Sequence, residues 1–213
     1  MSRSRRKFAV ISGSPSGIGA ELACYCLDNE FDILLCGEDD GLERAAARLA
    51  GSSGAVHAVR ADLATREGVE VVARTLREVH RPVDALLLVT GSDAAASALG
   101  GELEAGLQLI ALDCVHVVHL VKRIVPELVA RGAGRILITT TSAADGAVGA
   151  ICDAIRAFAS AFGQALRGEL HGTGVTVTLS SFDARSSFRA MLAGDELALP
   201  RTLTPREPPA AGR

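Results

Sequence analysis

The most constraining feature of this sequence is a glycine-rich turn that joins a short apolar run to a helical pattern. The apolar run, residues 8–11, suits a strand buried on both faces, and apolar residues recur at helical spacing from Ile18 onward. Gly13, Gly17 and Gly19 punctuate the turn. Without a Cβ, these residues permit a tight bend and close approach to a phosphate group, and the amino end of a helix favours an anion. The stretch therefore predicts a dinucleotide site.

The rest of the chain alternates between apolar runs and helical patterns. We expect strands at 8–11, 32–36, 55–60, 84–91, 135–139 and 175–179, and later helices at 42–49, 66–80, 103–130 and 151–170. In the longest helix, Pro126 is expected to bend or restart the chain before Gly132 and Gly134 end it. Because such alternation favours parallel strands with right-handed crossovers, the predicted fold is a doubly wound, Rossmann-type α/β sheet of about six strands.

Composition narrows the class of protein. With 213 residues, 48% of them hydrophobic, the chain suits one domain, which we place at residues 8–199 between a solvated basic tail (1–7) and a disordered Pro-rich tail (200–213). A net charge of -3 without long runs of one sign gives no reason to expect nucleic acid as a partner. No segment reads as a secretory signal or a membrane span. The five cysteines show neither metal-ligand spacing nor a disulfide framework, so we expect a cytoplasmic protein without a metal.

Several motifs together resemble the short-chain dehydrogenase/reductase family. Residues 12–19 are similar to its cofactor turn, Thr-Gly-x-x-x-Gly-Ile-Gly, and Asp62 and Leu63 to its adenine-contacting pair. Residues 84–91 stand where the family has Asp-x-Leu-Val-Asn-Asn-Ala-Gly. The resemblance runs from Phe8 to about Asp183. It implies that NAD(P), if still bound, would contact a set of turn and strand-end residues: Gly13, Ser14, Ser16, Gly17, Ile18, Gly19, Glu38, Asp62, Leu63 and Gly91.

Glu38 bears on which dinucleotide the site would take. It follows the second expected strand, where an NAD site usually offers a carboxylate to ribose and an NADP site an arginine to phosphate. An acid here would repel a 2′-phosphate, so NADP is the less favoured ligand. The alternative is that Glu38 is only a solvated carboxylate at the start of a helix and binds no ribose.

The catalytic residues of the family do not carry over. Its hydride transfer depends on Asn, Ser, Tyr and Lys, and the matching positions here are Asp113, Thr141 (or Ser142 with one inserted residue), Cys152 and Arg156. The only tyrosine of the chain is Tyr25, and the only lysines are Lys7 and Lys122. The nicotinamide end of the site therefore looks dismantled, and the C-terminal segment that usually closes the substrate pocket is mostly absent.

The replacing residues offer other chemistry. A cysteine thiol is intrinsically more acidic than a phenol, so Cys152 could act as acid, base or nucleophile, although buried cysteines are often inert. Arg156 could bind an anion or form a salt bridge with Asp113. His116 lies one helical turn from Asp113, where an imidazole beside a carboxylate can serve as a general base near neutral pH. Thr141 supplies a hydroxyl at the edge where such sheets bind ligands, or simply satisfies a strand end.

These observations leave three functions open. We expect first a biosynthetic enzyme that performs non-redox acid/base chemistry on a small molecule, such as dehydration, cyclisation, or a Michael or aldol-type step. The alternatives are an atypical NAD(P)H-dependent oxidoreductase or ketoreductase, and a non-catalytic partner with a vestigial cofactor cleft. The long helices, with His119 among their residues, are expected to form a homodimer or homotetramer.

Overall fold

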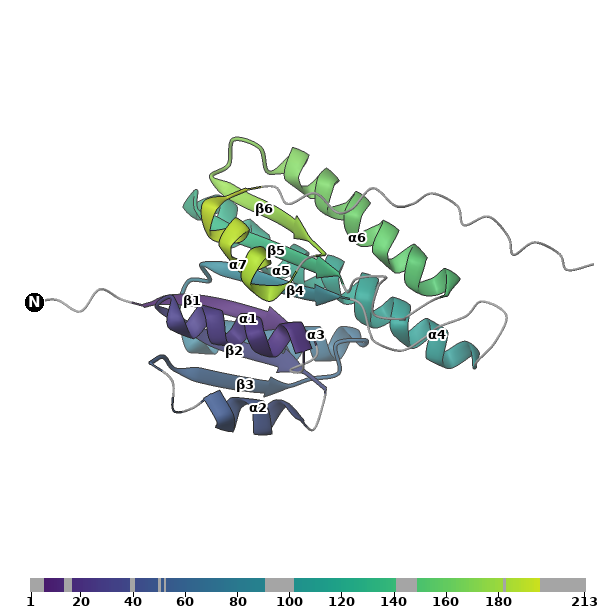
Figure 1. Cartoon of the computed structure of the whole chain (residues 1–213), viewed down its shortest axis with the longest axis horizontal. Helices are drawn as coiled ribbons and strands as arrows, with labels where there is room; N and C mark the ends of the chain where they lie inside the picture. The colour runs from purple at the N-terminus through teal and green to yellow at the C-terminus, as the bar shows by residue number, and fades with distance from the viewer. Residues whose placement is uncertain are drawn as a thin grey trace, which may run out of the picture.

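Six parallel strands form a single sheet in the order β3-β2-β1-β4-β5-β6 (Figure 1). The computed structural model describes residues 6–13, 17–38, 41–49, 51, 53–90, 102–140, 149–181 and 183–195. Its strands are β1 (Lys7–Ser12), β2 (Phe31–Gly37), β3 (Val56–Arg60), β4 (Ala85–Thr90), β5 (Gly134–Thr140) and β6 (Val175–Ser180). Every neighbouring pair is parallel. The predicted doubly wound, Rossmann-type sheet is therefore confirmed.

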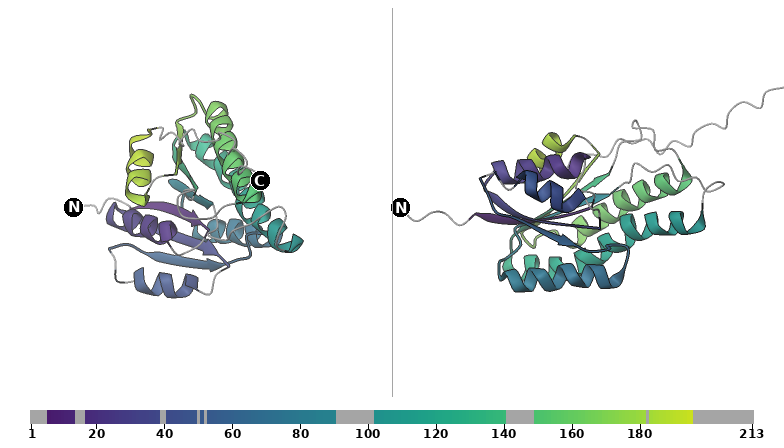
Figure 2. Two further views of the ribbon diagram at one scale, coloured as in Figure 1. Left: turned by 45° about the vertical axis from the view of Figure 1, so that its right-hand side comes forward. Right: turned by 90° about the horizontal axis from the view of Figure 1, so that it is seen from below.

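Helices cover both faces of the sheet, as Figure 2 shows in the view along its edge. One layer holds α1 (Gly17–Asp28), α2 (Gly41–Leu49) and α7 (Ala184–Ala193), and the opposite layer holds α3 (Arg66–Val79), α5 (His116–Arg131) and α6 (Ala150–Glu169). Each layer packs its apolar side chains against its own face, which gives two hydrophobic clusters. All residues of β2 and β4 are buried, which is why their sequences read as continuous apolar runs.

The central helical region departs from the expected pattern. It consists of α4 (Leu103–Ile110), a π-helical turn, η1 (Ala111–Val115), and α5. Pro126 does not restart the helix, because α5 runs through this residue to Arg131. Gly132, with φ of 69°, ends the helix as predicted, whereas Gly134 already belongs to β5.

The sequence analysis missed α7. Its amino end is capped by Asp183, whose carboxylate accepts the Ser186 N–H at 3.0 Å, and Gly194 ends it with φ of 74°. Phe188 and Met191, one turn apart, pack into the cluster that α1 also lines. An acidic cap and a final glycine are standard helix boundaries, so local signals for α7 were present.

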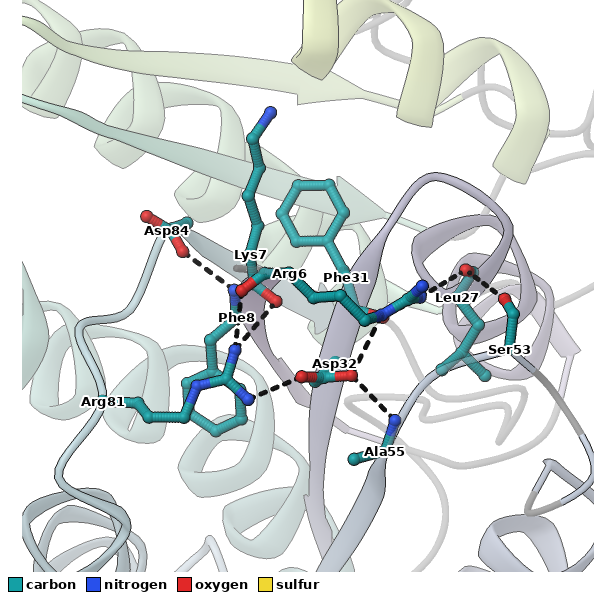
Figure 3. Close-up of polar contacts among 10 residues, drawn as sticks. All are labelled: Arg6, Lys7, Phe8, Leu27, Phe31, Asp32, Ser53, Ala55, Arg81 and Asp84. Carbon is teal, nitrogen blue, oxygen red and sulfur yellow. Dashed lines mark hydrogen bonds and ion pairs between the residues drawn. The ribbon is translucent and has the colours of Figure 1, made fainter. Parts of the chain in front are cut away.

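The amino ends of the strands are joined by a buried charge network around Asp32 (Figure 3). One carboxylate oxygen accepts Arg6 Nε at 3.1 Å and the Ala55 N–H at 2.8 Å, and the other accepts Arg81 Nη1 at 2.6 Å. Burial by itself raises the pKa of Asp32, but the hydrogen bonds from Arg81 and Ala55 and the two guanidinium charges outweigh it and lower the pKa. The network fixes β1, β2 and the start of β4 relative to one another.

This network corrects the boundary of the basic tail. Arg6 also donates to the Leu27 and Phe31 carbonyls at 2.8 and 2.9 Å, and Lys7 is the first residue of β1. Both residues were assigned to a solvated tail. They belong instead to the folded domain, because Asp32 gives the guanidinium of Arg6 a buried partner.

Candidate functional site

The carboxyl ends of the strands meet at one edge of the sheet, where open α/β sheets bind ligands. Four of the six strands end in a buried hydroxyl residue: Ser12, Thr90, Thr140 and Ser180. The strand order reverses between β1 and β4, so the switch point lies beside Ser12. The glycine turn that follows β1 is therefore placed where a dinucleotide would cross the sheet.

The geometry of the turn explains its glycines. Gly13 has φ of 114°, and a Cβ there would lie 2.5 Å from the Val89 carbonyl oxygen. Gly37, at the end of β2, is also closely packed, since a Cβ there would lie 2.9 Å from the Gly13 carbonyl oxygen. Gly17, the first residue of α1, has φ of 53°, and among the described residues no atom lies within 4 Å of the position that its Cβ would take. Gly13 is therefore packed closely against the ends of β2 and β4.

Ile18 and Gly19 continue α1, with Ile18 half-buried and Gly19 buried. Ser14 and Ser16 lie outside the described residues, as does Gly91.

The expected adenosine contacts lie at neighbouring strand ends. Glu38 is exposed just after β2. Asp62 accepts the Ala64 N–H at 2.9 Å in the turn that starts α3, and Leu63 is buried in the core. One carboxylate oxygen of Asp62 is thus engaged in holding the turn.

Asp113 and His116 lie where the central helix crosses the sheet edge. Asp113 is buried in η1, and His116 is the first residue of α5. The Nε2 atom of His116 lies 3.3 Å from Ser12 Oγ, a hydrogen bond between fully buried groups. Within the described residues, its Nδ1 atom makes no hydrogen bond of standard geometry.

The structure corrects the expected basicity of His116. Burial lowers its pKa to about 4, an effect that the Leu112 carbonyl opposes in part. The ring is therefore neutral at pH 7, and a base of this strength does not suit the general-base role proposed from the sequence.

Two candidate residues, Cys152 and Arg156, lie on α6 near the same edge of the sheet. Cys152 is buried in the first turn of the helix. Arg156 lies one turn further and pairs with Asp153. The guanidinium is thus held by a carboxylate three residues away on the same helix, and the salt bridge between Arg156 and Asp113 stays a prediction.

The hydroxyl run is only partly visible. Thr139 and Thr140, at the end of β5, are buried, and Thr90 Oγ1 donates to the Thr139 carbonyl at 2.9 Å. Thr141 and Ser142 lie outside the described residues, so their candidacy stays a prediction.

His119, expected at a subunit interface, bonds within the chain. Its Nε2 atom lies 2.9 Å from Glu70 Oε1 on α3, where Arg123 also binds. Among the described residues, the exposed large hydrophobic side chains all lie on this helical region: Leu103, Leu107, Ile110 and Val115 on α4 and η1, and Val129 on α5.

Sequence reasoning missed two buried polar pairs of this edge. The first is the Ser12–His116 contact, and the second is Ser180 with Ser187, whose Oγ atoms lie 2.7 Å apart. Ser12 was visible as part of the glycine motif, but its partner lies 104 positions away and carries no local signal.

The described residues offer neither a metal site nor a membrane-spanning helix. They contain no group of three or more His, Cys, Asp or Glu side chains placed to hold a metal ion. No helix among them is long and apolar enough to cross a membrane.

Comparison with known proteins points to one family. A family model described as short chain dehydrogenase matches residues 7–181. The chain is 32% identical over 180 residues to 1-deoxy-11-beta-hydroxypentalenate dehydrogenase of Streptomyces exfoliatus, a match that covers 80% of this chain and 64% of that protein. It is 27% identical over 175 residues to glycine betaine reductase of Emericella nidulans, covering 81% of this chain and only 14% of that longer protein. The chain thus spans less than two thirds of the length of these relatives.

A solved structure gives the same result. L-Sorbose reductase from Gluconobacter frateurii, complexed with NADPH and L-sorbose, superposes with a TM-score of 0.73 at 27% identity, covering 82% of this chain and 68% of that one. These relatives are named as reductases and dehydrogenases. The expected non-redox function, whether dehydration, cyclisation, or a Michael or aldol-type step, is therefore wrong, and the oxidoreductase alternative fits better.

Proposed function

Because the chain belongs to the short-chain dehydrogenase family, we propose that it is an NAD(P)-dependent oxidoreductase acting on a carbonyl or hydroxyl group of a small molecule. The observation that carries the proposal is the position of the glycine turn: Gly13 packs on the Val89 carbonyl, and the amino end of α1 follows at Gly17. Such an end offers unpaired N–H groups and a favourable dipole to a pyrophosphate.

The residues present fit the pyrophosphate and adenosine parts of a dinucleotide. Gly13, Gly17 and Ile18 would face the pyrophosphate, and Asp62 and Leu63 the adenine. Glu38, exposed beyond β2, would accept hydrogen bonds from the ribose hydroxyls and repel a 2′-phosphate. We therefore propose that the protein prefers NAD to NADP. A bound NADH would supply hydride to the carbonyl carbon.

The chain itself must then supply a proton to the carbonyl oxygen, and we propose Cys152 for this role. Its thiol would release the proton as the new C–H bond forms, and water would restore it afterwards. Thr141 or Ser142 would donate a hydrogen bond to the same oxygen, at the position the family gives to a serine. Asp113 and Arg156 would orient the polar groups around it, with Arg156 held in place by Asp153.

Titration of the purified protein with NADH, NAD, NADPH and NADP by calorimetry tests the binding half of the proposal. Micromolar binding of one of them is the expected result, and absence of binding by all four refutes it. Consumption of the bound dinucleotide in the presence of aldehydes and ketones, followed at 340 nm, tests the redox half.

A second candidate function is nucleotide binding without turnover, and the position of the single tyrosine favours it. Tyr25 lies in α1, where its hydroxyl accepts Arg185 Nε at 3.2 Å and its ring stacks on Phe188. It therefore serves the packing of α1 against α7 and not the edge near Cys152. Tight dinucleotide binding without oxidation by any carbonyl compound would support this candidate over the first.

We further propose that the protein acts as a homodimer or homotetramer in the cytoplasm. Support comes from the apolar residues on α4 and η1, of which Leu103 is 73% exposed and Leu107 49%. A second copy is the partner that could bury this face through the same helices. The absence of a disulfide framework in the sequence suits a reducing compartment. Light scattering on the eluting protein measures the assembly.

A further inference from the structure

One polar contact joins the end of β1 to the central helix. Ser12 Oγ lies 3.3 Å from His116 Nε2, and both side chains are at most 1% exposed. Alternation along β1 puts Ser12 on the same face as Phe8 and Val10, the face that α5 covers. The contact is thus a buried crosslink between an inner strand and the helix that packs on it.

Ser12 is the residue directly before the glycine turn. Gly13 donates its N–H to the Cys36 carbonyl at 3.2 Å and packs against the Val89 carbonyl. The first residue of the turn is therefore restrained by β2 and by β4, and through Ser12 by the central helix. Of these three restraints, only the last is made by side chains.

His116 stands at a special point of the helix. Its backbone N–H donates to the Ala111 carbonyl, five residues back, because the π-helical turn η1 precedes it. Asp113 lies inside that turn. The imidazole therefore connects two irregular segments of backbone, the glycine turn and the π-helical turn, that both lie at the ligand edge. Such π-helical turns occur often at functional sites.

We infer that His116 is a positioning residue: through its hydrogen bond to Ser12 it holds Gly13, the start of the glycine turn, in the position from which the turn would receive the pyrophosphate of the dinucleotide. The inference rests on the proposed function and assigns His116 no contact with substrate. A neutral, buried imidazole is suited to this task, since it keeps the same hydrogen bond across the physiological pH range.

Calorimetric titration with NADH and NADPH tests the inference, using the variants Ser12→Ala, His116→Leu, His116→Gln and the double variant Ser12→Ala/His116→Leu. Loss of a neutral hydrogen bond corresponds to about a fivefold change in an equilibrium constant, so each of the first two should raise Kd by about fivefold. The double variant should bind as weakly as either single one, since both remove the same bond. Glutamine places an amide near the position of Nε2 and should restore Kd to within about twofold of the wild type.

A matched control separates this effect from general loss of a buried hydrogen bond. Thr178 is equally buried and donates to the Asp195 carbonyl at 3.1 Å, on β6, three strands away from β1. Thr178→Val should lower thermal stability and leave Kd unchanged.

The outcomes are distinguishable. If the wild type binds neither NADH nor NADPH, the proposed function fails. If the wild type binds and the Ser12 and His116 variants bind equally well, or if their effects add in the double variant, only the positioning role fails. Should His116→Leu not fold, Ser12→Ala with unchanged Kd is sufficient to overturn the inference.

Discussion

Replacing Gly13 by alanine should destabilise the protein more than any other single-methyl change in the turn. The new Cβ would lie 2.5 Å from the Val89 carbonyl oxygen and 3.1 Å from the Val89 Cβ. Val89 cannot move aside, because it pairs with Thr139 in the centre of the sheet. A residue other than glycine in the left-handed region costs about 1–2 kcal/mol. Forcing a methyl group into a packed site costs about 1–3 kcal/mol more, so we expect a total loss of about 2–5 kcal/mol.

Two other glycines provide matched controls for this variant. Gly17 shares the positive φ, at 53°, but has open space around it, so Gly17→Ala should cost only about 1 kcal/mol. Gly168 is exposed near the end of α6 with normal φ, and Gly168→Ala should be neutral or stabilising by about 0.5 kcal/mol.

Urea unfolding followed by circular dichroism measures the series. With a slope of about 2–3 kcal/mol/M, a loss of about 3 kcal/mol lowers the midpoint by about 1–1.5 M for Gly13→Ala. Equal midpoints for Gly13→Ala and Gly17→Ala would refute the close approach of Gly13 to β4, on which this prediction rests.

Four further outcomes are expected. Asp32→Asn should lower the free energy of unfolding by about 2 kcal/mol at pH 7. Because the folded-state pKa of Asp32 is lowered, this difference should persist above its ordinary pKa near ~3.9 and disappear as the pH falls through the folded value, as acid titrations of both proteins would show. Glu38→Arg should shift preference toward NADPH over NADH by at least about tenfold in calorimetric Kd. Cys152→Ala should keep dinucleotide binding and reduce turnover by about a hundredfold; unchanged turnover would exclude the thiol as proton donor. Leu107→Glu should reduce the mass measured by light scattering to that of a smaller species.

The sheet and its helices were predictable because their signals are local. Continuous apolar runs identified β2 and β4, and helical spacing identified α3, whose capping residue Thr65 accepts the Gly68 N–H at 3.0 Å. The glycine turn was equally predictable, since Gly13 and Gly17 both have a positive φ, which favours glycine.

The missed features have different physical causes. The π-helical turn at Ala111–Val115 adds one residue to a regular pattern, and no residue type marks that addition. The helix was expected to bend or restart at Pro126, and it does not restart there, because packing of neighbouring residues on the sheet outweighs the local cost of the proline. The pairing of Arg156 with Asp153 could have been predicted from spacing alone, because residues three apart on a helix are neighbours.

The contact between Ser12 and His116 could not have been predicted from the sequence. It depends on the position of α5 over the sheet, where Val117, Leu120 and Ile124 pack into the same core as the residues of β1. The low pKa of His116 follows from the same burial, so a sequence that shows a histidine near an aspartate cannot reveal its charge.

The charge network at Asp32 has a practical consequence for handling the protein. Arg6 and Arg81 meet Asp32 at the amino ends of the strands, whereas the glycine turn lies at their carboxyl ends (Figures 1 and 3). A sensor chip or resin coupled through a tag ahead of Arg6 would therefore hold the molecule near the amino ends of the strands and leave their carboxyl ends facing the flowing solution. Small molecules could then be screened on immobilised protein without the support blocking their entry.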